Sequence, residues 1–166
     1  MQAERRRQEV LDILRQSAQP VSAGALAARF SVSRQIIVGD IALLRAGGAD
    51  ISATPRGYVI QHSPLGVVRQ VACRHNAAQM EAELNAIVDQ GCTVLDVIVE
   101  HPVYGQITGP LQLSSRYDVS QFLGRCNQPL SKLTEGIHLH TLSCPDEAAY
   151  ARVLSALEEL GFLLKD

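Results

Sequence analysis

The chain has 166 residues, of which 46% are hydrophobic and 19% are charged, a composition typical of a globular protein and not of a disordered one. No apolar run approaches the roughly 20 residues of a membrane span, and no signal sequence follows the basic N-terminus, so we expect a cytoplasmic protein with no membrane partner. The net charge of −2 hides an asymmetry: residues 1–60 carry +3 (eight Arg against five acidic residues), and residues 61–166 carry −5 (seven basic against twelve acidic). The first part therefore suits nucleic acid and the second does not.

The first 60 residues predict three helices followed by a hairpin. A stripe of apolar residues, with Arg5, Arg6 and Arg7 on the opposite face, predicts the first helix. The stripe consists of Val10, Leu11, Ile13 and Leu14. Ser22 and Ser33 are preferred N-cap residues and predict the starts of a second and a third helix.

The third helix is expected to end at the glycine pair 47–48. Its predicted apolar face consists of Ile36, Ile37, Ile41, Leu43 and Leu44. Short strands at 51–53 and 58–60 are expected to flank a tight turn at 54–57. This order of elements is typical of a winged helix-turn-helix, the DNA-binding fold in which the third helix enters the major groove.

Four residues are the predicted DNA contacts. Ser33, Arg34 and Gln35 lie at the start of the third helix, where Arg suits guanine and Gln suits adenine as bidentate partners. Arg56, at the hairpin tip, is placed to reach a phosphate or the minor groove. The three N-terminal arginines, 5–7, could add contacts to the DNA backbone. A small three-helix unit that binds another protein is the alternative.

Strands and helices alternate after a polar stretch at 62–66 that is a plausible linker. Strands are predicted at 67–75, 94–100, 106–113, 137–144 and, briefly, 162–164, and helices at 76–90, 118–126 and 146–160. The fold class is α+β, with helices covering one face of a sheet. The predicted domains are a winged helix-turn-helix at 1–61 and a second domain at 67–166.

Three histidines and a glutamate predict a metal site in the second domain. His138 and His140 are two residues apart on a strand, so they project from one face, about 7 Å apart and close enough to share an ion. His75 ends an earlier strand, and Glu83 flanks the apolar stripe of the next helix, where a carboxylate is costly unless it is paired or binds a metal. Such a set suits zinc, nickel or iron. A solvated His-x-His pair and an ion pair between Glu83 and an arginine are the alternatives.

The four cysteines form no Cys-x-x-Cys pair, which argues against a zinc ribbon, and they show no disulfide pattern. Most are expected to be small buried side chains. Cys73 shares a strand face with His75, and Cys144 shares one with His138 and His140, so either cysteine is a fallback metal ligand.

Three stretches together resemble a known family. SVSRQIIVGDIALLRAGGADISATPRGYVI is similar to the helix-turn-helix half of the nicotinic-acid-responsive transcriptional repressors of bacterial NAD metabolism. HPVYGQITGPLQLSSRYDV and GIHLHTLSC resemble their C-terminal half, the 3H domain. The resemblance implies one divalent metal ion per chain, held by His75, Glu83, His138 and His140. It also implies a repressor with nicotinic acid as corepressor that controls niacin uptake or NAD synthesis.

The remaining candidates concern the ligand. His101 precedes a proline at a strand end, where it either lines the ligand pocket or holds the turn. Tyr104 and Arg116 either help to recognise an anionic ligand, since Arg suits a carboxylate, or are structural. Open coordination positions would let a pyridine carboxylate bind the ion directly.

The sequence also leaves two competing functions open and predicts a homodimer. A regulator for which the metal itself is the signal, and a metal-dependent hydrolase fused to a DNA-binding module, are the competing functions. No Ser-His-Asp order, phosphate-binding loop or His-Glu-x-x-His motif is present, so we do not expect an enzyme. A homodimer is expected, because one recognition helix covers too few base pairs for useful specificity.

Overall fold

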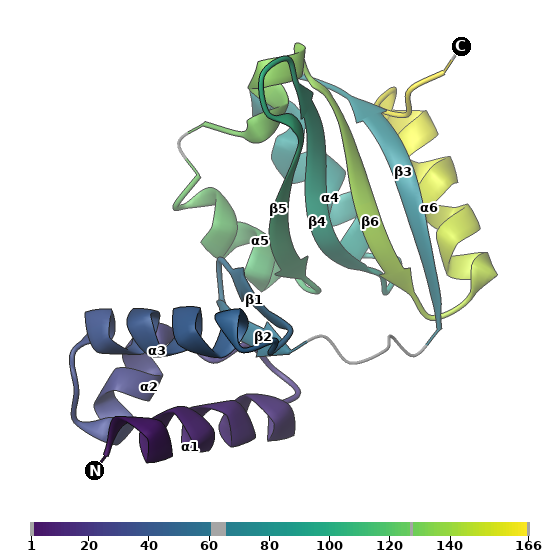
Figure 1. Ribbon diagram of the computed structural model, residues 1–166. Helices are drawn as coiled ribbons and strands as arrows, with labels where there is room; N and C mark the ends of the chain where they lie inside the picture. Colours follow the sequence, from purple (N-terminus) through teal and green to yellow (C-terminus); the bar gives the residue numbers. More distant parts are fainter. Residues whose placement is uncertain (1, 61–65, 127, 166) are drawn as a thin grey trace. The chain divides into compact units, whose positions relative to one another are not determined.

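A computed structural model describes residues 2–60, 66–126 and 128–165 (Figure 1). The chain divides into two compact units, Met1–Ser63 and Pro64–Asp166. The predicted linker, 62–66, lies outside the described residues except for Gly66, and the predicted domain boundaries stay predictions. Within the described part of the chain, no helix has both the length and the apolar character needed to cross a membrane.

The first unit contains three helices and a two-stranded hairpin. The helices are α1 (Ala3–Gln16), α2 (Ala23–Phe30) and α3 (Arg34–Ala46), and the strands are β1 (Ile51–Thr54) and β2 (Gly57–Ile60). Ser22 and Ser33 cap α2 and α3 as predicted, because their hydroxyls accept the N–H of Ala25 (3.0 Å) and Ile36 (3.2 Å). The predicted winged helix-turn-helix is confirmed at the level of its elements.

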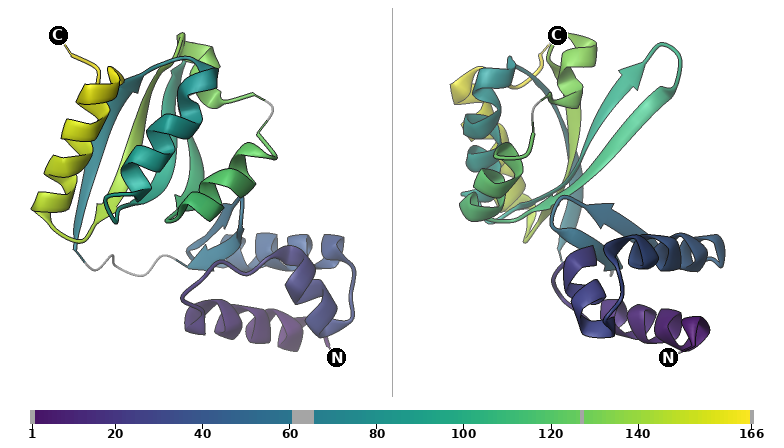
Figure 2. Two further views of the ribbon diagram at one scale, coloured as in Figure 1. Left: turned by 180° about the vertical axis from the view of Figure 1, so that it is seen from behind. Right: turned by 90° about the vertical axis from the view of Figure 1, so that its left-hand side faces the viewer.

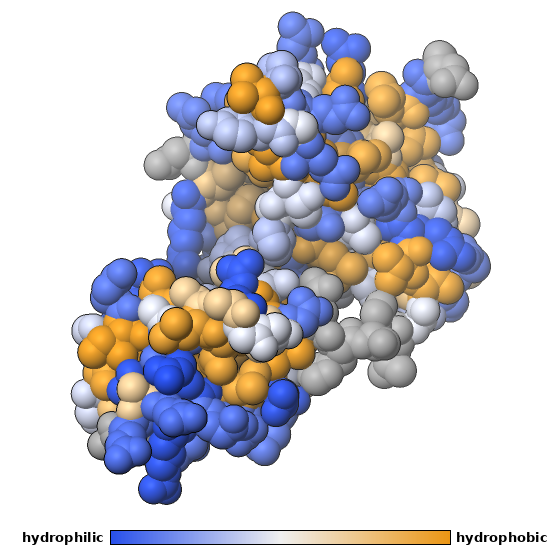
Figure 3. Space-filling model, viewed as in Figure 1, coloured by the Kyte–Doolittle hydropathy of each residue, from blue (hydrophilic) through white to orange (hydrophobic). Residues whose placement is uncertain are grey.

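The apolar face predicted for α3 is wrong in part. Ile37 and Ile41 are buried, but Ile36 is 42% exposed and Leu43 is 58% exposed. Apolar residues accordingly reach the surface of this unit (Figure 3). At 100° per residue the buried side of α3 is centred between Ile37 and Ile41, and it includes Asp40, which the sequence does not mark as a core position.

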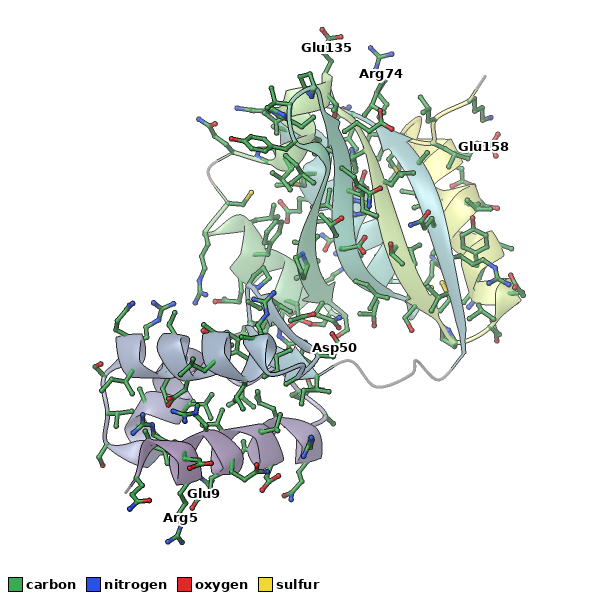
Figure 4. All side chains as sticks on the ribbon, viewed as in Figure 1. Arg5, Glu9, Asp50, Arg74, Glu135 and Glu158 are labelled. Atoms are coloured by element: carbon green, nitrogen blue, oxygen red, sulfur yellow. The ribbon has the colours of Figure 1, made fainter. Side chains whose placement is uncertain are left out.

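Asp40 is buried because an arginine of α1 pairs with it. Arg6 donates from Nε to Oδ2 (2.6 Å) and from Nη2 to Oδ1 (3.1 Å). The sequence pattern places Arg6 on a free polar face of α1. The structure instead pairs it with the buried Asp40. Arg5 does point away from the core, beside Glu9, and the two form an exposed ion pair at 3.1 Å (Figure 4).

The second unit is an antiparallel sheet with helices on one face (Figure 2). The strands are β3 (Val67–Arg74), β4 (Thr93–His101), β5 (Gly105–Leu113) and β6 (Ile137–Cys144), in the spatial order β3-β6-β4-β5. The helices are α4 (Met80–Val88), α5 (Arg116–Leu123) and α6 (Glu147–Leu160), with 3₁₀ turns at Ala77–Gln79 and Leu130–Thr134. The predicted α+β fold is confirmed.

Small differences from the prediction have local causes. The helix predicted at 76–90 begins as a 3₁₀ turn, which Asn76 and Gln79 close with a reciprocal capping box. Helix α5 begins at Arg116 and not at 118, because Ser115 caps it. The final strand predicted at 162–164 is reduced to a single bridge between Cys73 and Leu163.

Candidate metal centre and DNA-binding surface

Three buried imidazoles surround one buried carboxylate in the second unit. His75 follows β3, His138 and His140 lie on β6, and Glu83 lies on α4, which packs on that face of the sheet. Glu83 has an exposed fraction of 0%, and the three histidines are also buried. His138 Nε2 lies 2.8 Å from Glu83 Oε2, His140 Nε2 lies 2.5 Å from Oε1, and His75 Nε2 also contacts Oε2. The structure thus brings together all four residues that the sequence predicted for a metal site.

The other nitrogen of each ring faces a backbone carbonyl. The Nδ1 atom of His75 lies 2.7 Å from the Asn76 oxygen, that of His138 lies 2.9 Å from the Gly136 oxygen, and that of His140 lies 2.7 Å from the Asp96 oxygen. A carbonyl oxygen only accepts, so each Nδ1 carries the proton. In neutral rings the Nε2 lone pairs then point at a carboxylate, which also only accepts. This arrangement of acceptors needs a cation or additional protons at its centre.

The electrostatics of these buried groups also indicate that the site needs positive charge at its centre. Burial by itself raises the pKa of the Glu83 carboxyl, but the imidazoles, His140 foremost, outweigh burial and hold that pKa well below its usual value. Burial lowers the pKa of His75 and His140, but the Glu83 carboxylate outweighs it and raises the pKa of both rings. The site therefore holds Glu83 ionised and attracts positive charge.

Two backbone features orient the rings. The carbonyl of Gly136 accepts from His138 Nδ1 and, at 3.4 Å, from the His75 N–H. Gly136 has φ +92°, and a Cβ at this position would lie 2.3 Å from the His75 carbonyl oxygen, so only glycine fits. On the other side the register of β4 shifts near Asp96, whose carboxylate accepts the Thr141 N–H at 2.9 Å while its carbonyl faces His140.

The two cysteines that share strand faces with the histidines differ in their surroundings. Cys73 is 0% exposed, and its Sγ, a Glu83 oxygen and a His138 nitrogen all lie within 4.8 Å of one another. Cys73, Glu83 and His138 therefore form a buried group that could hold a metal ion. Cys144 instead interacts with the thiol of Cys92. Burial, followed by this interaction with Cys144, raises the pKa of the Cys92 thiol to about 12.

A cavity of about 240 Å³ adjoins the imidazoles and Glu83. Apolar side chains make most of its wall, and they come from α4, β4, β5, α5 and the segment before β6. They include Met80, Leu84, Leu111, Phe122 and Leu130. The polar part of the wall is the carboxylate–imidazole group itself with Gln128, Ser131 and Cys126. The cavity can hold a small planar molecule with one end at this group.

The predicted DNA contacts lie at the surface of the first unit. Arg34 and Gln35 are exposed on the first turn of α3, and Ser33 caps that turn. Arg56 lies in the two-residue turn between β1 and β2, and its guanidinium donates to Gln19 Oε1 at 3.0 Å. An exposed basic helix start next to a hairpin is the surface by which winged helices dock on DNA.

The chain matches two known domain families and two curated relatives. Residues 6–59 match the HTH domain and residues 68–166 match the 3H domain. The chain is 44% identical to the Transcription repressor NadR of Bacillus subtilis (strain 168), over 97% of this chain and 94% of the relative. It is also 44% identical to the Probable transcription repressor NiaR of Thermotoga maritima, over the same shares. The chain belongs to this family of transcription repressors.

This membership confirms several predictions from the sequence. The fold class and the resemblance to repressors are confirmed, and the HTH domain implies DNA binding. The relatives are transcription repressors and not enzymes, which confirms the expectation for this chain and counts against the hydrolase alternative.

The three residues predicted to contact the ligand do not lie with the candidate metal site. The Nδ1 of His101 accepts the N–H groups of Val103 (3.1 Å) and Tyr104 (3.2 Å), so His101 holds the β4–β5 turn. Tyr104 is 78% exposed at the same turn. Arg116 donates to both carboxylate oxygens of Asp89, at 2.7 and 2.5 Å. None of the three is among the described residues that line the cavity.

The apolar residues that line the cavity carry no mark in the sequence. Phe122 and Met80 belong to ordinary apolar helical stripes, and Leu130 lies in a segment where no regular element was predicted. Their role depends on which elements fold against β4 and β6, and a local pattern does not encode that.

Proposed function

We propose that this repressor binds operator DNA in response to nicotinic acid and controls genes of niacin uptake or NAD biosynthesis. The observation that carries the proposal is a buried carboxylate–imidazole group that opens onto an apolar cavity of about 240 Å³. Such a site suits a small ring compound with one charged end. A repressor of this kind acts on the chromosome, so we place it in the cytoplasm.

The donor set fits a divalent metal ion. His75, Glu83, His138 and His140 would hold it, because their lone pairs converge and their protonated Nδ1 atoms are fixed by backbone carbonyls, the arrangement usual behind metal-binding histidines. Nickel, zinc and iron all accept imidazole and carboxylate ligands. When bound, the ion would supply positive charge and open coordination positions at the mouth of the cavity.

The apolar wall of the cavity suits the ring of nicotinic acid. Only the end of the cavity at the proposed metal ion suits the carboxylate of nicotinic acid. No Lys or Arg occurs among the described residues that line it, so the carboxylate has no cationic side chain to pair with. The carboxylate or the ring nitrogen is therefore proposed to face the metal site, with the apolar ring against Met80, Phe122 and Leu130.

DNA binding is proposed to use the exposed start of α3 and the hairpin. Arg34 and Gln35 would contact base edges, Ser33 would hold the helix start, and Arg56 would contact a phosphate or the minor groove. Replacement of Arg34 or Gln35 by Ala should cost about 1–3 kcal/mol of discrimination at one base position. Arg5→Ala should weaken binding to all sequences alike and reduce the salt dependence.

The protein is proposed to act as a homodimer on a two-fold symmetric operator. Each subunit offers one α3, and two copies of that helix on successive major grooves would supply the specificity that one lacks. Light scattering at operator-binding concentrations should give twice the mass of one chain. A monomer bound to a full operator would contradict this assembly.

The test of the function is a double variant of the metal site. Nicotinic acid can promote binding only if it favours the DNA-competent arrangement over the other, so loss of its site should abolish the response. We expect His138→Ala/His140→Ala to lose its metal and its nicotinate response but to retain non-specific DNA binding. His101→Ala, whose ring lies at the β4–β5 turn, is the matched control and should respond normally.

The measurements are metal content and operator affinity with and without nicotinic acid. A double variant that loses its metal and still responds would show that the ion and the corepressor site are separate. Operator binding that follows metal concentration alone, with no effect of nicotinic acid, would favour the regulator for which the metal itself is the signal.

A further inference from the structure

Cys73 is a buried thiol that lies against the proposed metal site. It belongs to β3, and the register of β3 and β6 places it directly opposite His138, so both side chains project from the same face of the sheet. Its Sγ lies within 4.8 Å of both a Glu83 oxygen and a His138 nitrogen. An ordinary core cysteine packs its sulfur on apolar atoms, whereas this one faces a carboxylate and an imidazole.

The position of Cys73 is held by backbone on both sides. On one side β3 pairs with β6 along its whole length. On the other side the Arg74 N–H donates to the Phe162 carbonyl (2.8 Å) and the Leu164 N–H donates to the Ala72 carbonyl (3.0 Å). The thiol therefore stays beside Glu83 and His138, and a small rotation about its χ1 is the motion available to it.

We propose that Cys73 is a metal ligand, which adds one sulfur to the proposed set of three imidazoles and Glu83. Around a five-coordinate zinc ion, with Zn–N of about 2.0–2.1 Å and Zn–S of about 2.3 Å, a sulfur and an adjacent nitrogen ligand are about 3.1–3.6 Å apart. Donor atoms that already lie within 4.8 Å reach that spacing with a shift of about 1 Å. The ion–sulfur bond replaces the S–H bond, and one proton passes to solvent.

The sulfur changes which metal the site prefers. Thiolate is a soft ligand that favours zinc over harder divalent ions such as manganese, whereas imidazole and carboxylate discriminate less among them. A mixed set of sulfur, nitrogen and oxygen donors therefore favours zinc over manganese in this chain. This inference rests on the proposed metal site and concerns its ligands, not the corepressor.

X-ray absorption at the zinc edge tests the inference on the full-length, zinc-loaded protein. We expect one sulfur neighbour at about 2.3 Å beside nitrogen and oxygen neighbours at about 2.0–2.1 Å. Cys73→Ala should lose the sulfur neighbour and bind zinc at least tenfold more weakly in competition with a chromogenic chelator. Cys144→Ala is the matched control, since Cys144 is a buried cysteine of β6 that interacts with Cys92, and it should retain both the sulfur signal and the affinity.

The outcomes separate this inference from the proposed function. A wild-type spectrum with nitrogen and oxygen neighbours alone would overturn the role of Cys73 and leave the site of three histidines and Glu83 intact. Failure of the wild-type protein to bind zinc, nickel or iron would overturn the proposed metal site as well. The wild-type spectrum decides the sulfur ligand even if Cys73→Ala fails to fold.

Discussion

Two neighbouring isoleucines of α3 offer a sharp test of how the first unit is packed. The periodic pattern of the sequence assigns both Ile36 and Ile37 to the apolar face, whereas the structure buries Ile37 completely and leaves Ile36 42% exposed. The perturbation is the same in both cases, truncation to Ala. The change in the free energy of unfolding should therefore report the burial of each side chain.

The expected magnitudes differ by about 2 kcal/mol or more. Ile→Ala removes three carbons, which at about 0.8 kcal/mol per buried carbon is about 2.4 kcal/mol for Ile37, and the cavity left behind raises the cost to about 3–4 kcal/mol. At Ile36 about half of that transfer free energy applies, and no closed cavity is left. The better helix propensity of Ala also offsets a few tenths of a kcal/mol. Ile36→Ala should therefore cost about 1 kcal/mol or less.

Hydrogen exchange is the assay, because the two units can unfold in separate transitions. For a unit of about 60 residues the total stability is about 3–9 kcal/mol, so Ile37→Ala should remove much of the protection of the amides in α3. The amides of α6, in the other unit, serve as an internal control and should not change. Equal loss of protection in Ile36→Ala and Ile37→Ala would refute the burial pattern of α3.

Three further variants test other features of the structure. Arg6→Ala should destabilise α1 and α3 by leaving Asp40 buried without its main partner, and it should leave the salt dependence of DNA binding unchanged; a reduced salt dependence would show that Arg6 contacts DNA instead. Gly136→Ala should abolish metal retention, because its Cβ would lie 2.3 Å from the His75 carbonyl oxygen, and normal metal content would contradict the close approach. Ser33→Ala should destabilise α3 by about 1 kcal/mol, measured by hydrogen exchange, through loss of the cap; unchanged protection would show that the cap contributes nothing.

The candidate metal site shows how far residue spacing can predict which side chains come together. Because alternate residues of a strand face the same side, His138 and His140 had to share a face wherever β6 lay in the sheet. The convergence of both on Glu83 depends on α4 packing over β6, across 55 residues of chain between Glu83 and His138. The three carbonyls that fix the rings, and Gly136 above all, follow from backbone geometry that no side-chain pattern records.

The sequence by itself determined the elements of this protein, because caps, periodicity and turn residues act within a few positions of each other. Ser22 and Ser33 start their helices, and β6 runs from Ile137 to Cys144 as its alternating pattern predicts. Only the tertiary structure decided which sides of those elements are buried and what they meet. Arg6 is drawn inward by Asp40, 34 residues away, and Ile36 stays exposed because no described element of the first unit covers that side of α3. Burial is a property of partners that are distant in sequence, and a local pattern contains no information about where those partners lie.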